Sequence, residues 1–162
     1  LQELYLEFKD IDLKVKKLSS QITQLNSISE TAQKLLTIPG VGPLSASVLG
    51  IELGDGTCFK NGRHFSSYLG LVPNERSSGG KVRLLGITKR GDSYLRGLLI
   101  HGARAVVYRV SKLPLEQCDR LQSWLKKLIT QNGVNKAIVA LANKNARMAW
   151  AIVITGEAYK IV

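Results

Sequence analysis

The strongest constraint in this sequence is a heptad repeat of apolar residues near its start. The repeat is a seam of seven side chains, spaced alternately four and three residues apart: Leu4, Phe8, Ile11, Val15, Leu18, Ile22 and Leu25. This spacing places all seven at the a and d positions of a single helix. A lone helix cannot bury such a seam. We therefore expect residues 1–29 to form a helix that packs either on its own domain or on a second copy in a coiled coil, and we favour the second copy.

The rest of the chain reads as one further domain, residues 30–162, which is an ordinary size for a self-sufficient core. Prolines, glycines and capping residues predict six helices, over residues 30–37, 43–51, 62–68, 92–110, 114–130 and 134–155. Residues 71–89 are rich in Gly and Ser, and we expect a loop with extended stretches there. The predicted fold class is mostly α: an N-terminal coiled-coil helix, then a helical domain with a helix–hairpin–helix element and a Gly/Ser-rich basic loop.

Positive charge is concentrated in the middle of the chain. The whole chain carries +11, and residues 60–112 alone carry +9, from eleven basic side chains against Glu75 and Asp92. Such a segment favours a polyanionic partner, and nucleic acid fits better than a membrane surface because the basic residues do not follow one amphipathic helix. A generally solvated basic surface is the alternative. No apolar run approaches the roughly 18–20 residues of a membrane span, so we expect no membrane partner.

The cysteines and histidines do not indicate a metal site or a disulfide framework. Cys58 and Cys118 are far apart, which argues for an intracellular, cytoplasmic protein, and neither pairs with His64 or His101 at metal-ligand spacing. We therefore expect no metal or cofactor in this chain itself. We expect His101 to be a packing residue and three aromatic side chains to belong to the core, namely Trp124, Trp150 and Tyr159.

Residues 35–46 resemble a helix–hairpin–helix element, with Gly40, Val41 and Gly42 in the hairpin. Two glycines let the backbone approach a phosphate closely, and the N–H groups at the start of the next helix can hold the anion. Such a contact recognises the nucleic-acid backbone rather than its sequence. A simple corner between two helices is the alternative interpretation.

A second candidate site is the segment Ser77-Ser-Gly-Gly-Lys81 and the basic residues that follow it. Its hydroxyls could attack a phosphodiester while nearby cations stabilise the charge of the transferring phosphate. From spacing alone this idea is weak, because Ser-Gly segments are also common linkers. The cations that we expect to contact nucleic acid are Lys81, Arg83, Lys89, Arg90 and Arg96.

Several motifs together resemble one protein family. They occur in the order that the family shows, and the match covers roughly residues 30–157: Ile38-Pro-Gly-Val-Gly-Pro43, Phe59 to Arg63, Tyr68-Leu-Gly-Leu-Val-Pro73, Ser77-Ser-Gly-Gly-Lys81, Gly86-Ile-Thr-Lys-Arg-Gly-Asp92, Tyr94-Leu-Arg96, Gly102-Ala-Arg104, Asn135 to Ala142 and Ala149-Trp150. The sequence thus resembles the C-terminal part of the insertion-sequence transposases related to the Piv invertase, a family that includes bridge-RNA-guided recombinases.

The resemblance implies a longer enzyme, and the absence of an initiator Met agrees with this expectation. A RuvC-like domain with four metal-binding acids, and hence Mg²⁺, would precede the coiled coil and this domain. A catalytic serine would form a covalent link to DNA, and the matching residue here is Ser78, with Ser77 as the second choice. The implied partners are DNA, a guide RNA and a further copy of the chain. Without the metal domain, we expect this chain alone to be inactive.

The predicted function is therefore the serine-bearing, DNA-binding half of a DNA transposase. The alternative is a helix–hairpin–helix module that binds DNA without chemistry.

Overall fold

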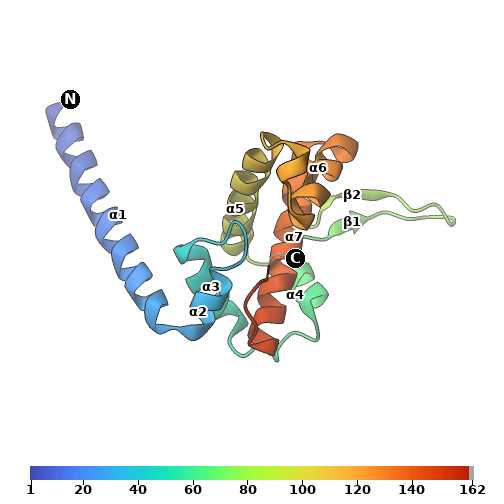
Figure 1. Cartoon of the computed structure of the whole chain (residues 1–162), viewed down its shortest axis with the longest axis horizontal. Helices are drawn as coiled ribbons and strands as arrows, with labels where there is room; N and C mark the ends of the chain where they lie inside the picture. Colours follow the sequence, from blue (N-terminus) through green and yellow to red (C-terminus); the bar gives the residue numbers. More distant parts are fainter. Residues whose placement is uncertain (161–162) are drawn as a thin grey trace.

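The computed structural model describes residues 1–160, which are almost entirely helical (Figure 1). Over these residues the chain forms seven α-helices, one short 3-10 turn and two strands: α1 (Gln2–Ile28), α2 (Glu30–Leu35), α3 (Pro43–Leu53), α4 (Gly62–Tyr68), β1 (Pro73–Glu75), β2 (Leu84–Ile87), α5 (Ser93–Ser111), η1 (Leu115–Gln117), α6 (Arg120–Asn132) and α7 (Val134–Thr155). The mostly helical class predicted from the sequence is confirmed.

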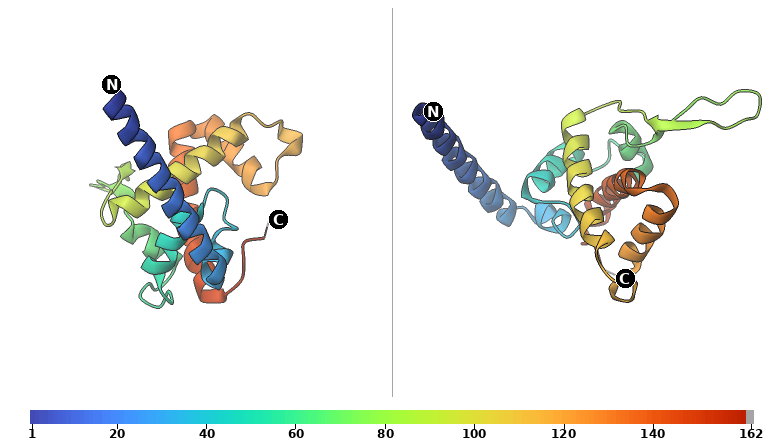
Figure 2. Two further views of the ribbon diagram at one scale, coloured as in Figure 1. Left: turned by 90° about the vertical axis from the view of Figure 1, so that its left-hand side faces the viewer. Right: turned by 90° about the horizontal axis from the view of Figure 1, so that it is seen from above.

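Helix α1 projects away from the rest of the molecule (Figures 1 and 2). Its last turn is held by Asn26, which is 3% exposed: the Asn26 amide donates to the Pro43 carbonyl over 2.7 Å, and the Ser47 hydroxyl donates to Asn26 Oδ1 over 2.6 Å. The heptad seam is left open, with Ile11 59% and Leu18 58% exposed. Packing of the seam on its own domain, one of the two alternatives from the sequence, is therefore wrong.

Helix α7 is the centre of the core, with α4, α5 and α6 packed on it. More than half of its buried apolar positions are alanine, which lets the neighbouring helices approach closely: Ala137, Ile138, Leu141, Ala142, Ala146, Ala149 and Ile152. By length and composition alone α7 could cross a membrane, with a mean hydropathy of 1.2 over 18 residues. Because three helices of the same chain cover it, we assign it as the core helix of the domain.

Two predicted elements differ in the structure. The helix expected from residue 114 begins at Arg120, because Asp119 forms a capping box with Gln122 and the residues before it make only the turn η1. The segment expected to be a loop at 71–89 contains an antiparallel hairpin of β1 and β2.

Side-chain burial also departs from prediction in one place. His101 is exposed on α5, so its assignment as a packing residue is wrong. Trp124, Trp150 and Tyr159 are half-buried against the core, as expected. Trp150 is fixed by its indole N–H, which donates to the carbonyls of Gly56 and Phe59, both at 3.1 Å.

Candidate nucleic-acid interface

The turn between α2 and α3 is locked against the rest of the domain by a glycine pair. Gly40 has φ +87°, and a Cβ at Gly102 of α5 would lie 1.8 Å from the Gly40 carbonyl oxygen. The turn is also held by Asn145 of α7, whose amide donates to the Pro39 carbonyl over 2.9 Å. A hydrogen bond and a close backbone contact at this corner give the α2–α3 turn a fixed position on α5 and α7.

The three predicted contact residues in this turn have different environments. Val41 is 7% exposed and belongs to the core, and its N–H donates to the Ile38 carbonyl over 3.0 Å. Gly42 is the N-cap residue of α3, and nothing lies within 4 Å of the position its Cβ would take. Gly42 and the first turn of α3 are thus better placed for a phosphate than Val41, and the contact itself stays a prediction.

The β1–β2 hairpin carries the two serines at its tip. Pro73 pairs with Ile87 and Glu75 with Leu84, and beyond the strands Ser78 pairs with Lys81. Gly79 and Gly80 form the two-residue turn with φ +59° and +77°, and two positive values in succession are what this tight, right-twisted connection requires. The Ser-Gly-Gly-Lys sequence is therefore a hairpin turn and not an irregular linker.

The base of the hairpin is anchored by backbone contacts. A Cβ at Gly91 would lie 1.9 Å from the Tyr68 carbonyl oxygen, and the Lys89 N–H donates to the Gly70 carbonyl over 3.1 Å. Arg96 closes this junction: its Nη1 lies 3.1 Å from the carbonyl oxygens of both Leu69 and Arg90. Among the five predicted cationic contacts, Arg96 is the one that this geometry favours least, because its guanidinium group joins α5 to the hairpin base.

Ser77 and Ser78 have different surroundings on the hairpin. The Ser77 hydroxyl donates a hydrogen bond to the Glu75 carboxylate and accepts one from the Arg83 N–H at 3.4 Å. Ser78 is exposed at the start of the turn. Glu75 is thus an acidic partner of Ser77 that was not singled out from the sequence. The alternation of a strand, which puts residues i and i+2 on the same face, could have revealed Glu75.

The cations around the hairpin are not neutralised within the protein. Lys81, Arg83, Lys89 and Arg90 are all exposed. Across residues 1–160, the ion pairs within 4.0 Å join only Lys14, Lys16, Lys34 and Lys160 to neighbouring acids, and none of the basic residues of 60–112 takes part. An excess of unpaired positive charge on one segment is the electrostatic pattern of a polyanion-binding surface.

A family comparison identifies the chain. Residues 32–117 match the family model described as Transposase IS116/IS110/IS902 family. The chain belongs to this transposase family. The matched residues run from α2 to η1 and so contain the α2–α3 turn, the β1–β2 hairpin and α5.

Individual relatives agree with the family match. Over 160 residues the chain is 42% identical to a probable family 20 transposase of Pseudomonas aeruginosa. This match covers 99% of the chain and 46% of that protein. It is 41% identical to the transposase for insertion sequence element IS1111A of Coxiella burnetii, over 97% of this chain and 42% of that protein. A pilin gene-inverting protein of Moraxella bovis is 28% identical to the chain, over 86% of this chain and 43% of that protein. The chain thus spans less than half the length of these relatives.

The part of this transposase chain that the structure describes offers no metal centre. No three or more His, Cys, Asp or Glu side chains come together there. Two acids at the end of α3 and in the turn after it have other partners: Glu52 accepts a hydrogen bond from the Tyr68 hydroxyl over 2.7 Å, and Asp55 accepts bonds from Thr57. The Glu52 contact raises the pKa of the Tyr68 phenol, and the Thr57 backbone bond lowers the pKa of Asp55. The Mg²⁺ implied by the family therefore does not fit the described residues.

Proposed function

We propose that this chain is the DNA-binding and serine-bearing part of a DNA transposase, with Ser78 as the nucleophile. The observation that carries the proposal is the position of Ser78: it is exposed at the tip of a hairpin whose base is fixed by Gly70, Gly91 and Arg96. A projecting tip can enter a DNA groove, while its anchored base holds the hydroxyl in a defined place.

The proposed reaction is the exchange of one phosphodiester for another. The Ser78 Oγ–P bond forms, a P–O bond to the sugar breaks, the hydroxyl proton passes to a base and the departing sugar oxygen takes up a proton. Lys81 and Arg83 lie on the same hairpin and would stabilise the negative charge on the phosphate oxygens. Ser78 has no built-in base in the described residues, so its activation is assigned to a part of the full-length protein beyond them.

The partners follow from this assignment. DNA is the substrate, a guide RNA and a second copy of the chain through α1 are further proposed partners, and the site of action is the bacterial cytoplasm with its nucleoid. Mg²⁺ is assigned to the separate RuvC-like domain of the full-length protein. The isolated chain is expected to bind DNA and to form no covalent adduct.

The test is peptide mapping of a trapped protein–DNA adduct from the full-length transposase. We expect the DNA to be attached at Ser78, and Ser78→Ala to abolish the adduct while DNA binding persists. Attachment at Ser77 would move the assignment by one residue, and attachment outside the hairpin would refute it. A full-length protein that binds DNA but shows neither adduct nor recombination would support the second candidate, a helix–hairpin–helix binding module without chemistry.

A further inference from the structure

A groove of about 1080 Å³ lies between the β1–β2 hairpin and helices α6 and α7. Its apolar surface comes from Leu84, Leu85 and Ile87 on the hairpin side and from Trp124 and Val139 on the helical side. Leu84 is 61% exposed, so the groove is open to a partner. No residue of the described chain fills it.

The rim of this groove is positively charged. Lys89, Lys136, Lys144 and Arg147 line it, and no Asp or Glu is among its lining residues. The Lys144 ammonium lies 5.2 Å from the centre of the Trp124 ring, so one cation sits directly above the aromatic surface. An apolar floor under a cationic rim suits a ligand that has both flat apolar faces and negative charges.

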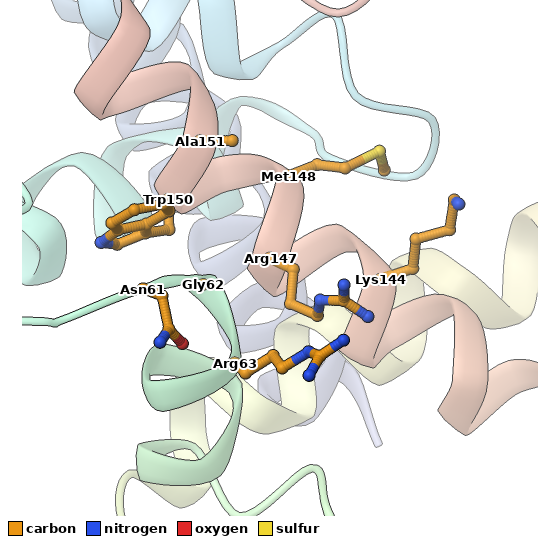
Figure 3. A pocket seen from close by; sticks show the side chains of 8 residues that line it. All are labelled: Asn61, Gly62, Arg63, Lys144, Arg147, Met148, Trp150 and Ala151. Atoms are coloured by element: carbon orange, nitrogen blue, oxygen red, sulfur yellow. The ribbon is translucent and has the colours of Figure 1, made fainter.

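A second, smaller pocket of about 530 Å³ adjoins the groove, because Lys144 and Arg147 line both. Figure 3 shows that the guanidinium groups of Arg63, from α4, and Arg147, from α7, lie near each other in this pocket. Two like charges repel each other, and no carboxylate lines the pocket to compensate them. This arrangement favours an anion between the two arginines.

Gly62 fixes the two arginines relative to each other. A Cβ at Gly62 would lie 2.9 Å from the Arg147 carbonyl oxygen, so α4 begins in direct backbone contact with α7. The Arg63 side chain on α4 therefore begins close to the point on α7 where the Arg147 side chain begins. Two guanidinium groups on adjoining rigid helices can bind a phosphate with little loss of conformational freedom.

We infer that the groove and the pocket together hold an unpaired strand of DNA, with a phosphate between Arg63 and Arg147 and a base on the apolar floor near Trp124. This inference rests on the proposed function, because it takes the bound strand to be the DNA on which the serine of the neighbouring hairpin acts. Duplex DNA presents only base edges and phosphates, whereas an unpaired strand can lay its base faces on apolar and aromatic side chains. The apolar floor therefore selects the unpaired strand.

The test compares three oligonucleotides of one sequence, as single-stranded DNA, duplex DNA and single-stranded RNA, by fluorescence anisotropy with the 162-residue chain. The variant Arg63→Gln/Arg147→Gln removes two charges from the pocket. Its matched control, Arg120→Gln/Lys127→Gln, removes two exposed charges from α6 that line neither the groove nor the pocket. We expect the first variant to lose single-strand DNA affinity about tenfold or more and to reduce the salt slope by about 0.7, the value for one phosphate contact on a single strand.

Each double variant loses two positive charges, which should weaken duplex binding equally in both. For duplex DNA we therefore expect both variants to bind within about threefold of the parent. Equal losses on single strand and duplex, or equal losses in the variant and its control, would overturn the inference in favour of a general basic surface. A loss confined to the RNA strand would also overturn it and assign the groove to RNA.

A second readout is independent of charge. Bases stacked on Trp124 should quench its fluorescence, and Trp124→Phe should remove that quenching while strand affinity stays within about threefold, since a phenyl ring still offers a stacking face. Unchanged quenching in Trp124→Phe would contradict the placement of a base there. The two proposals fail separately. Absence of an adduct in the full-length parent protein counts against the catalytic proposal, and absence of a single-strand preference in this chain counts against the groove.

Discussion

The carboxylate of Glu75 accepts a hydrogen bond from the hydroxyl of Ser77, two residues further along the same face of the hairpin. Ser78, the next residue, lies exposed at the start of the Gly79–Gly80 turn. The two adjacent serines are therefore chemically different: one hydroxyl is held by an acid, and the other is free to approach a ligand.

This difference gives the first prediction, on the full-length transposase. With Ser78 as the nucleophile, Ser77→Ala and Glu75→Gln should each leave adduct formation within about tenfold of the parent, because they alter only the support of the hairpin. Ser78→Ala should remove the adduct. Single-turnover assays with labelled DNA measure all three. If Ser77→Ala and Glu75→Gln both lowered the rate by roughly 100-fold or more, as the loss of a nucleophile or its base does, Ser77 with Glu75 as its base would be the reactive pair.

The local features of the fold were predictable from the sequence. The heptad spacing predicted α1, and Asp92 was correctly expected to cap α5, where its carboxylate accepts from the N–H groups of Tyr94 and Leu95. For residues 71–89 the sequence predicts extended stretches within a loop but not their pairing into a hairpin, although Gly79–Gly80 is a turn signal. The later start of α6 was also readable, since Asp119 and Gln122 have capping-box spacing.

The long-range contacts were not predictable. Nothing in the local sequence shows that Gly40 meets Gly102, or that Arg63 and Arg147 share a pocket. Such pairs depend on how α4, α5 and α7 pack, which one sequence without structure does not specify. A polyanionic partner could be proposed from charge alone, whereas the groove beside the hairpin could not be predicted.

The second prediction concerns the Gly40–Gly102 contact. Gly102→Ala would place a Cβ 1.8 Å from the Gly40 carbonyl oxygen, so α5 and the α2–α3 turn must separate. We expect the free energy of unfolding to fall by about 2–4 kcal/mol, the range of a severe core disruption. Gly97→Ala on the same helix is the control, because nothing lies within 4 Å of its Cβ position, and it should raise the stability by about 0.5–1 kcal/mol. Urea denaturation measures both, and equal effects would contradict the close contact.

The third prediction is the salt dependence of duplex DNA binding. If roughly five to nine of the unpaired cations of residues 60–112 neutralise phosphates, log Kd should rise with log salt concentration with a slope of about 4–8. A titration at several ionic strengths measures this slope. Lys81→Gln/Arg83→Gln, on the exposed part of the hairpin, should reduce it by about 2. A flat salt response would show that the positive charge does not serve nucleic-acid binding.

The last prediction concerns the open seam of α1. Ile11 and Leu18 are 59% and 58% exposed although they occupy d positions, and α1 projects from the domain with no part of the described chain over the seam. β-branched Val15 and Ile22 at a, with leucine at most d positions, favour two strands; Phe8 at a and Ile11 at d depart from this pattern. We therefore expect a dimer by multi-angle light scattering and a monomer for Ile11→Asp/Leu18→Asp, since two buried carboxylates would disrupt the seam.

The matched control is Lys17→Asp/Gln24→Asp, which places the same two acids at the outer c positions and should stay dimeric. A monomeric parent at high concentration, or a dimer that survives Ile11→Asp/Leu18→Asp, would rule out this seam as the contact between copies.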